Sequence, residues 1–288
     1  MAGVKELRVR IKSVGNIKQV TRAMEMVATT KLRRFQDRAV ASRPYALEIA
    51  GLVGRLSAML GDQNSENPLF DAGKGDKRLM LVVSSDRGLC GSYNTALFRV
   101  LEAWRTEHGE NAVYFVYGKK AFAYMHKRGF DIERVLTDPT LESIDYRTAA
   151  ITARMLVDEF KSGEYSDVQV LSTRFESMAK YVPEVMQFLP ISYEGLGGEA
   201  GSGADIVLEP DAETIFEQLI PRYLETRIYN ALLESLTSEY ASRRFAMKNA
   251  TDAATDMQKA LRGVYNRKRQ ENITKELLDI VGGVEALS

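Results

Sequence analysis

Long helical repeats occupy both ends of this 288-residue sequence, and they constrain the fold more than any other feature. In the first 60 residues, apolar side chains recur at steps of three and four, the spacing of one face of an α-helix. Two sets are joined by a step of three, which predicts a local overwinding of a coiled coil. The sets are Val4, Leu7, Ile11 and Val14, followed by Ile17, Val20, Met24 and Val27.

The C-terminal end repeats the pattern over a longer stretch. No proline follows Pro221 for 67 residues, which is room for a helix of ~100 Å. The apolar positions there are Ala250, Ala254, Met257, Leu261 and Val264. After a polar interruption at 266–272, a second apolar series follows, with Ile273, Leu277, Ile280, Val284 and Leu287.

Neither helix is expected to stand alone, because a long amphipathic helix must bury its apolar stripe. The simplest arrangement is an antiparallel coiled coil of the two ends. The C-terminal helix is the longer one, so its tip, with Ile280, Val284 and Leu287, should project beyond its partner. An exposed apolar tip predicts a further protein that covers it.

The middle of the chain has a different period. Short apolar runs at 78–85, 111–118, 167–175 and 182–190 predict strands, with Pro183 and Pro190 at the edges of the last. Helical patterns at 94–108, 119–128 and 146–162 alternate with them. This alternation indicates a Rossmann-like α/β domain inserted between the two long helices.

The predicted domain boundaries follow from these patterns. An N-terminal shaft helix at 1–60 leads through a linker at 61–77 to the α/β domain at 78–194. A glycine-rich flexible link at 195–208 then leads to a C-terminal shaft helix at 209–288.

Composition argues against several classes of protein. One cysteine and two histidines make an internal disulfide impossible and a zinc site improbable. No apolar run approaches the ~18 to 20 residues of a membrane span, and the N-terminus lacks a secretory signal. The first 60 residues carry twelve Lys and Arg against four acidic residues, although the whole chain is neutral.

The turn SSDRGLCGSYN (84–94) follows a predicted strand and precedes a predicted helix, where a phosphate loop would lie. It matches neither of the two glycine-rich phosphate fingerprints, so Gly88 and Gly91 are interpreted as turn residues. Cys90 is interpreted as a buried small side chain and Asp86 as a helix cap, with a contact to a neighbouring chain as the alternative. We therefore expect no catalytic residue, cofactor or metal site.

Basic residues in KLRRFQDR (31–38) could contact nucleic acid, but few aromatic residues lie among them. A solvated or partner-facing helix surface is the preferred interpretation. Two other classes of function remain to be compared with a shaft protein. One is a nucleotide-binding α/β enzyme with a coiled-coil dimerisation arm, and the other is a basic coiled-coil nucleic-acid binder.

Four motifs in order resemble the gamma-subunit family of F-type ATP synthases. They are TRAMEMVA in the first helix, SSDRGLCGSYN in the α/β domain, SLTSEYASRRFAMKNATDAATDM, and YNRKRQENITKELLDIVGGVEAL at the end. The resemblance covers nearly the whole chain. It implies a rotor shaft within a hexamer of three alpha and three beta subunits, a foot against the epsilon subunit and the membrane c-ring, and a role in coupling proton flow to ATP synthesis or hydrolysis.

The same resemblance implies contact residues. Met24 would pass an acidic loop of a beta subunit, and Lys31, further along the same helix, would also contact the alpha/beta hexamer. Arg243, Gln270, Thr274 and Glu276 would meet beta-subunit loops from the last helix, although Glu276 could equally pair within the shaft. Glu209 and Asp211 would lie in the foot, toward the c-ring.

Two departures affect the details. The ending GGVEALS places Glu285 near the tip, and Arg244 replaces a smaller apolar residue usual in the family. The absence of a transit peptide favours a bacterial source. The expected location is therefore the cytoplasmic side of the inner membrane, bound peripherally through the complex.

Overall fold

The computed structural model describes residues 3–60, 67–192, 209 and 211–285, with the side chains of 110 and 282–285 excepted. The chain forms two compact units. The shaft unit comprises Met1–Thr29 and Arg243–Ser288, and the head unit comprises Thr30–Ser242. Helices α1 (Val4–Leu60) and α5 (Ala212–Glu285) each contribute one segment to each unit.

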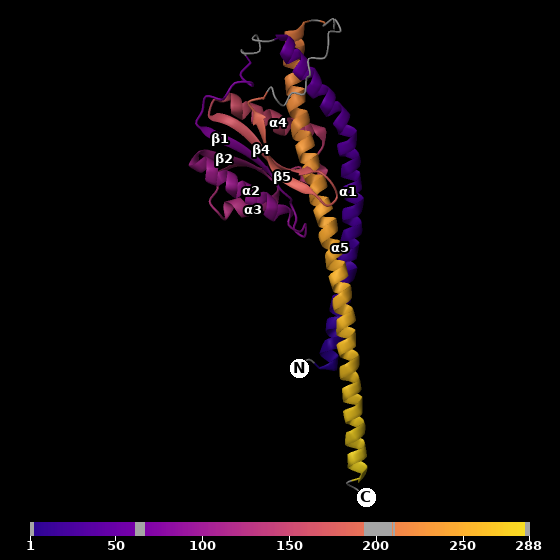
Figure 1. Ribbon diagram of the computed structural model, residues 1–288. Coiled ribbons are helices and arrows are strands. Elements are labelled where there is room, and N and C mark those ends of the chain that lie inside the picture. The colour runs from indigo at the N-terminus through magenta and orange to yellow at the C-terminus, as the bar shows by residue number, and fades with distance from the viewer. Residues whose placement is uncertain (1–2, 61–66, 193–208, 210, 286–288) are drawn as a thin grey trace. The chain divides into compact units, whose positions relative to one another are not determined.

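The head unit contains a five-stranded sheet in the order β3-β2-β1-β4-β5 (Figure 1). The strands are β1 (Lys77–Val83), β2 (Ala112–Tyr117), β3 (Ile132–Leu136), β4 (Tyr165–Phe175) and β5 (Tyr181–Leu189). All neighbours pair in parallel except β4 and β5, which are antiparallel. A mostly parallel sheet, inserted in the sequence between two long helices, confirms the predicted fold class.

Helices cover both faces of the sheet, as buried parallel strands require. On one face α2 (Tyr93–His108) and α3 (Lys119–His126) enclose an apolar core with Met80, Val82 and Leu97. On the other, α4 (Tyr146–Lys161) packs against β4 (Figure 1). Helix α5 contacts the end of β4 directly, since Ser235 Oγ accepts a 3.0 Å hydrogen bond from the backbone N–H of Thr173.

Two short 3₁₀ helices, η2 (Gly109–Asn111) and η3 (Leu141–Ser143), complete the head unit within the described residues. The predicted helices of the α/β domain are confirmed to within a few residues, whereas β3 was not predicted. Pro183 was wrongly placed at a strand boundary, because it lies inside β5 opposite Thr173. The domain boundaries stay predictions, and the link at 195–208 lies outside the described residues.

Candidate functional site: the paired terminal helices

In the shaft unit, α1 and α5 pair through small and polar side chains. Thr251 Oγ1 donates to Thr21 Oγ1 over 2.9 Å, and Gln258 Nε2 donates to the carbonyl of Ile11 over 3.5 Å. A Cβ atom added to Gly15 would lie 2.9 Å from Gln258 Nε2, so glycine allows the two helices to approach closely here. Rising numbers on α1 match falling numbers on α5, and the segments are therefore antiparallel.

The last described pairing lies near the start of α1. Arg8 Nη2 donates to the hydroxyl of Tyr265 over 3.1 Å, which lowers the pKa of that tyrosine through the hydrogen bond. Helix α1 begins only one turn earlier, at Val4, whereas α5 continues to Glu285. Figure 1 shows α5 extending beyond the N-terminal end of α1.

The projecting segment exposes several apolar side chains, as the sequence predicted. Between 44% and 66% of each is exposed, and they are Ile273, Leu277, Leu278, Ile280 and Val281. Of the three predicted tip residues, the structure places Ile280 there, 64% exposed. The side chains of Val284 and Leu287 lie outside the described residues.

The predicted step of three in the apolar seam is wrong. Ile17, Val20 and Val27 are each more than half exposed, and the buried positions on α1 are instead Leu7, Val14 and Ala28. On α5, Met257 and Val264 are likewise exposed, and the half-buried Gln258 and Tyr265 take their places. The buried seam therefore follows a regular heptad, and polar residues occupy some of its positions.

The predicted hexamer contacts fall into different environments. Gln270, Thr274 and Glu276 are all exposed and lie on α5 beyond the last described pairing. Met24 is half-buried, and Arg243 is only 6% exposed. The structure thus brings the three C-terminal residues together on one free helical segment and places Arg243 in the interior.

Lys31 belongs to the head unit, where it joins three elements. Its ammonium pairs with the carboxylate of Glu142 on η3, and the hydroxyl of Tyr240 on α5 donates to the same carboxylate. Burial acts to raise the pKa of Glu142, but hydrogen bonds from Lys31 and Tyr240 outweigh it and lower that pKa. A contact that the resemblance assigns to a partner subunit is thus occupied within the chain.

A second cluster in the head unit was not predicted. Glu225 on α5 is 1% exposed, and its carboxylate accepts two hydrogen bonds from Arg154 on α4, at 3.0 and 2.8 Å. Arg222 and the hydroxyl of Tyr146 complete the set, each at 3.2 Å. The sequence carries no clear signal for it, since Glu225 stands between Arg222 and Arg227 in a helix of mixed composition. Buried charge with this many partners fixes α4 to α5.

The two predicted foot residues lie at the start of α5. Glu209 and Asp211 are both exposed. Asp211 caps the helix, since its carboxylate accepts hydrogen bonds from the N–H and the hydroxyl of Thr214 at 2.8 and 2.9 Å. These bonds lower the pKa of Asp211. Asp211 therefore has a structural role whatever it contacts outside the chain.

The polar groups of the turn at 84–94 bond within the turn or to α3. Asn94 donates to Ser85 Oγ over 2.7 Å and to Cys90 Sγ over 3.2 Å, and Gly91 adopts a positive φ of 58°. Cys90 is buried, as predicted. Asp86 is a cap, but it accepts from the N–H of Lys119 at the start of α3 rather than serving the helix that follows the turn.

No cluster of three or more metal-ligating side chains occurs among the described residues. In the same part of the chain, no helix is both long and apolar enough to cross a membrane.

Comparisons with known proteins agree with this architecture. A family model described as ATP synthase matches residues 3–287. The ATP synthase gamma chain of Mycobacterium marinum is 42% identical over all of this chain and 98% of its own length. That of Desulfosudis oleivorans is 38% identical over all of this chain and 99% of its own length.

Two solved structures have a similar fold. A chain of the Tetrahymena thermophila mitochondrial ATP synthase central stalk and c-ring is 25% identical, with a TM-score of 0.62 over 80% of this chain and 99% of that one. A chain of the Euglena gracilis mitochondrial ATP synthase, in a structure of OSCP, F1 and c-ring, is 21% identical, with a TM-score of 0.67 over 99% of this chain and 94% of that one. These structures share the fold, and the family model and the full-length relatives show that the chain belongs to the gamma-chain family of ATP synthases.

Proposed function

We propose that this chain is the central rotor shaft of an F-type ATP synthase. In this role it couples proton flow through a c-ring to ATP synthesis or hydrolysis in an alpha3-beta3 hexamer, and it performs no catalysis itself. The observation that carries the proposal is the antiparallel helix pair with a projecting C-terminal segment, found in a chain of the gamma family. An apolar helix that turns in an apolar sleeve meets few directional bonds to break at each step.

The contact residues belong to the proposal. Met24, Gln270, Thr274 and Glu276 would face the hexamer, and Ile280, Val284 and Leu287 would sit in its sleeve. Glu209 and Asp211 would lie in the foot, near the epsilon subunit and the c-ring. Lys31 and Arg243 would reach the hexamer only after their present environments open, because one is paired with Glu142 and the other is 6% exposed.

The proposed location is the cytoplasmic side of a bacterial inner membrane, where the chain is held peripherally through its complex. Neither a cofactor nor a nucleic acid is needed for this role. The side chains of Ser85 and Asn94 bond within the 84–94 turn, and Ser84 and Asp86 accept hydrogen bonds from α3, so these polar groups already have partners within the chain. This supports the shaft over a nucleotide-binding enzyme.

Affinity purification of the complex from membranes tests the assignment. We expect one copy of this chain for three alpha and three beta subunits. The purified chain alone should hydrolyse no ATP and bind no nucleotide tightly. A saturable ATPase activity in the isolated chain, or a self-dimer without alpha and beta subunits, would instead support the α/β enzyme with a dimerisation arm.

Shortening the tip tests its role. Deleting residues from Val281 onward should lower the yield of assembled complex, because each buried Val or Leu contributes ~1.5 to 3 kcal/mol. The assembled complex should keep its ATPase activity, since the deleted segment carries no catalytic group. A full-length variant with Leu278→Ser and Ile280→Ser is the matched control, because it removes apolar contact without shortening the helix. Loss of ATPase activity in a correctly assembled truncated complex would contradict the proposal.

A further inference from the structure

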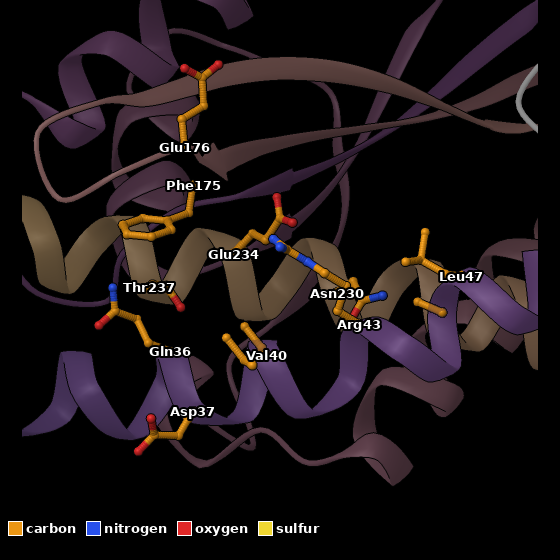
Figure 2. A pocket seen from close by; sticks show the side chains of 12 residues that line it. Gln36, Asp37, Val40, Arg43, Leu47, Phe175, Glu176, Asn230, Glu234 and Thr237 are labelled. Atoms are coloured by element: carbon orange, nitrogen blue, oxygen red, sulfur yellow. The ribbon is translucent and has the colours of Figure 1, made fainter.

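The head unit contains a cavity that the shaft function does not use. It has a volume of about 530 Å³ and lies between α1, α5 and the end of β4 (Figure 2). This volume falls within the range of ~300 to 1,000 Å³ that small-molecule sites occupy. The cavity is therefore large enough for a compact organic ligand.

One part of the cavity wall is apolar. Val40 and Leu47 on α1 are each 67% exposed, and Phe175 contributes its ring from the end of β4. Figure 2 shows Val40 on α1 facing the region where Glu234 and Phe175 lie. A ligand with a hydrocarbon or aromatic body would cover these side chains and remove apolar surface from water.

The charges that line the cavity are mainly negative. Three acidic residues, Asp37, Glu176 and Glu234, stand against one base, Arg43. Glu176 is already neutralised, since it pairs with Arg174 at 3.1 Å and Lys180 at 2.6 Å. Among the described residues, neither Asp37 nor Glu234 pairs with a cation within 4.0 Å. Asp37 is exposed to water, whereas Glu234 is half-buried, so the carboxylate of Glu234 is the one best placed to receive a ligand's charge.

The surroundings of Glu234 support this reading. Burial, followed by repulsion from Glu184 on β5, raises the pKa of Glu234. A hydrogen bond from the backbone of Phe175, together with the charges of Arg43 and Arg174, acts in the opposite direction. A half-buried carboxylate with a raised pKa gains more from a cation at short range than an exposed one does.

We propose that this cavity binds a small organic cation with an apolar body, whose ammonium group pairs with Glu234 and whose hydrocarbon part packs on Val40, Leu47 and Phe175. Such a ligand would bridge α1, α5 and the end of β4. The inference concerns the head unit alone, and its test does not depend on assembly into an ATP synthase.

The test uses the full-length chain and a photoreactive phenylalkyl amine, with the labelled peptides identified by mass spectrometry. We expect saturable labelling within residues 36–47, 175–178 or 230–237. Unlabelled 3-phenylpropylamine should compete, and 3-phenylpropanol and 3-phenylpropionate should compete at least about tenfold less well, because a charge-assisted hydrogen bond contributes ~1.5 to 3 kcal/mol.

Glu234→Gln provides the decisive variant, because its amide can still accept the hydrogen bond from Phe175 while it lacks the charge. Affinity for the amine should fall about tenfold. Glu107→Gln makes the same charge change at an exposed position outside the cavity and should leave affinity unchanged. In the unsubstituted chain affinity should also fall as pH is lowered and Glu234 becomes protonated, and the glutamine variant should lose this dependence.

Four outcomes would overturn the inference. One is equal competition by the amine and the alcohol, which would make the cavity merely apolar. Preference for the carboxylate would instead assign the site to Arg43. Unchanged affinity in a folded Glu234→Gln variant, or the absence of saturable labelling in these segments, would remove the site altogether.

Discussion

The same two helices pair by different means in the two units. In the shaft unit the seam contains Thr21, Thr251 and Gln258, and apolar side chains such as Val20 remain exposed. In the head unit, α5 buries Leu232, Leu233 and Leu236 completely. One stretch of helix is thus committed to its own chain, whereas the other keeps apolar surface for proteins outside it.

The two units also differ in the contacts that fix the positions of their helices. In the head unit, ion pairs made by the buried Glu225 and the partly buried Glu142 fix α5 and α1 to particular elements of the α/β domain. In the shaft unit, one hydrogen bond between two threonines and the close approach at Gly15 set the register beside a few buried apolar side chains such as Leu7 and Val14. Substitutions of the same chemical kind should therefore have unequal effects in the two regions.

The largest contrast is expected for leucine to alanine. Leu101 on α2 is fully buried, so Leu101→Ala should lower the free energy of unfolding of the head unit by about 3 to 4 kcal/mol. Leu278→Ala, at a position 66% exposed, should change stability by less than about 0.5 kcal/mol. Urea denaturation followed by fluorescence of the single tryptophan, Trp104, measures the head unit. Equal losses for the two variants would remove the distinction.

The cluster at Glu225 should show the next largest effect. Glu225→Ala removes the acceptor shared by Arg154, Arg222 and Tyr146, and should cost about 2 to 3 kcal/mol in urea denaturation. Both arginine side chains are more than half exposed and can return to water, which limits the loss. Glu217→Ala, an exposed position on the same helix, is the matched control. A loss no larger than that of the control would mean that α4 and α5 are held by apolar contacts alone.

A smaller, pH-dependent effect is expected at Glu142. Its pKa is lowered in the folded chain, so its contribution to stability is present above the unfolded value and is lost as pH falls through the folded value. Glu142→Gln should cost about 1 kcal/mol near neutral pH and almost nothing in acid. Chemical denaturation at several pH values checks this. Parallel pH profiles for the original chain and the variant would contradict it.

The smallest expected effect is an increase in the stability of the helix pair in the shaft unit. Replacing Thr21 and Thr251 together by valine removes both partners of one hydrogen bond and adds apolar contact in the seam. Stability of the helix pair should rise by up to about 1 kcal/mol, seen as a higher melting temperature by far-ultraviolet circular dichroism. Each single valine variant should be neutral or worse, because it leaves one hydroxyl without this partner. A loss in the double variant would show that the threonines do more than set the register.

Much of the fold could be predicted because local patterns there agree with tertiary packing. The strands β1 and β2 are buried along most of their length and therefore form continuous apolar runs. The strand β3 escaped detection because it is an edge strand with exposed Glu133 and Arg134 at its centre. Its sequence carries no burial signal to recognise.

The site was predicted less well for a related reason. Counting apolar residues assumes that they face the partner helix, but Ile17 and Val27 face outward while Thr21 lies in the seam. The sequence does not say which apolar side chains serve the chain itself and which serve other proteins. The exposed C-terminal segment could be anticipated because no second helix remained to cover it. The ion pair of Glu225 could not be anticipated, because its partner Arg154 lies 71 residues away in the sequence.

Pro183, inside the edge strand β5, bears on how the free chain avoids self-association. The backbone N–H of the opposing Thr173 donates to Ser235 on α5, on the side away from β5, so in this antiparallel pair the ring nitrogen of Pro183 points outward. The outer edge of the sheet therefore lacks one donor that an incoming strand would need. A chain that must remain available until other subunits bind it gains from an edge that resists growth into a longer sheet.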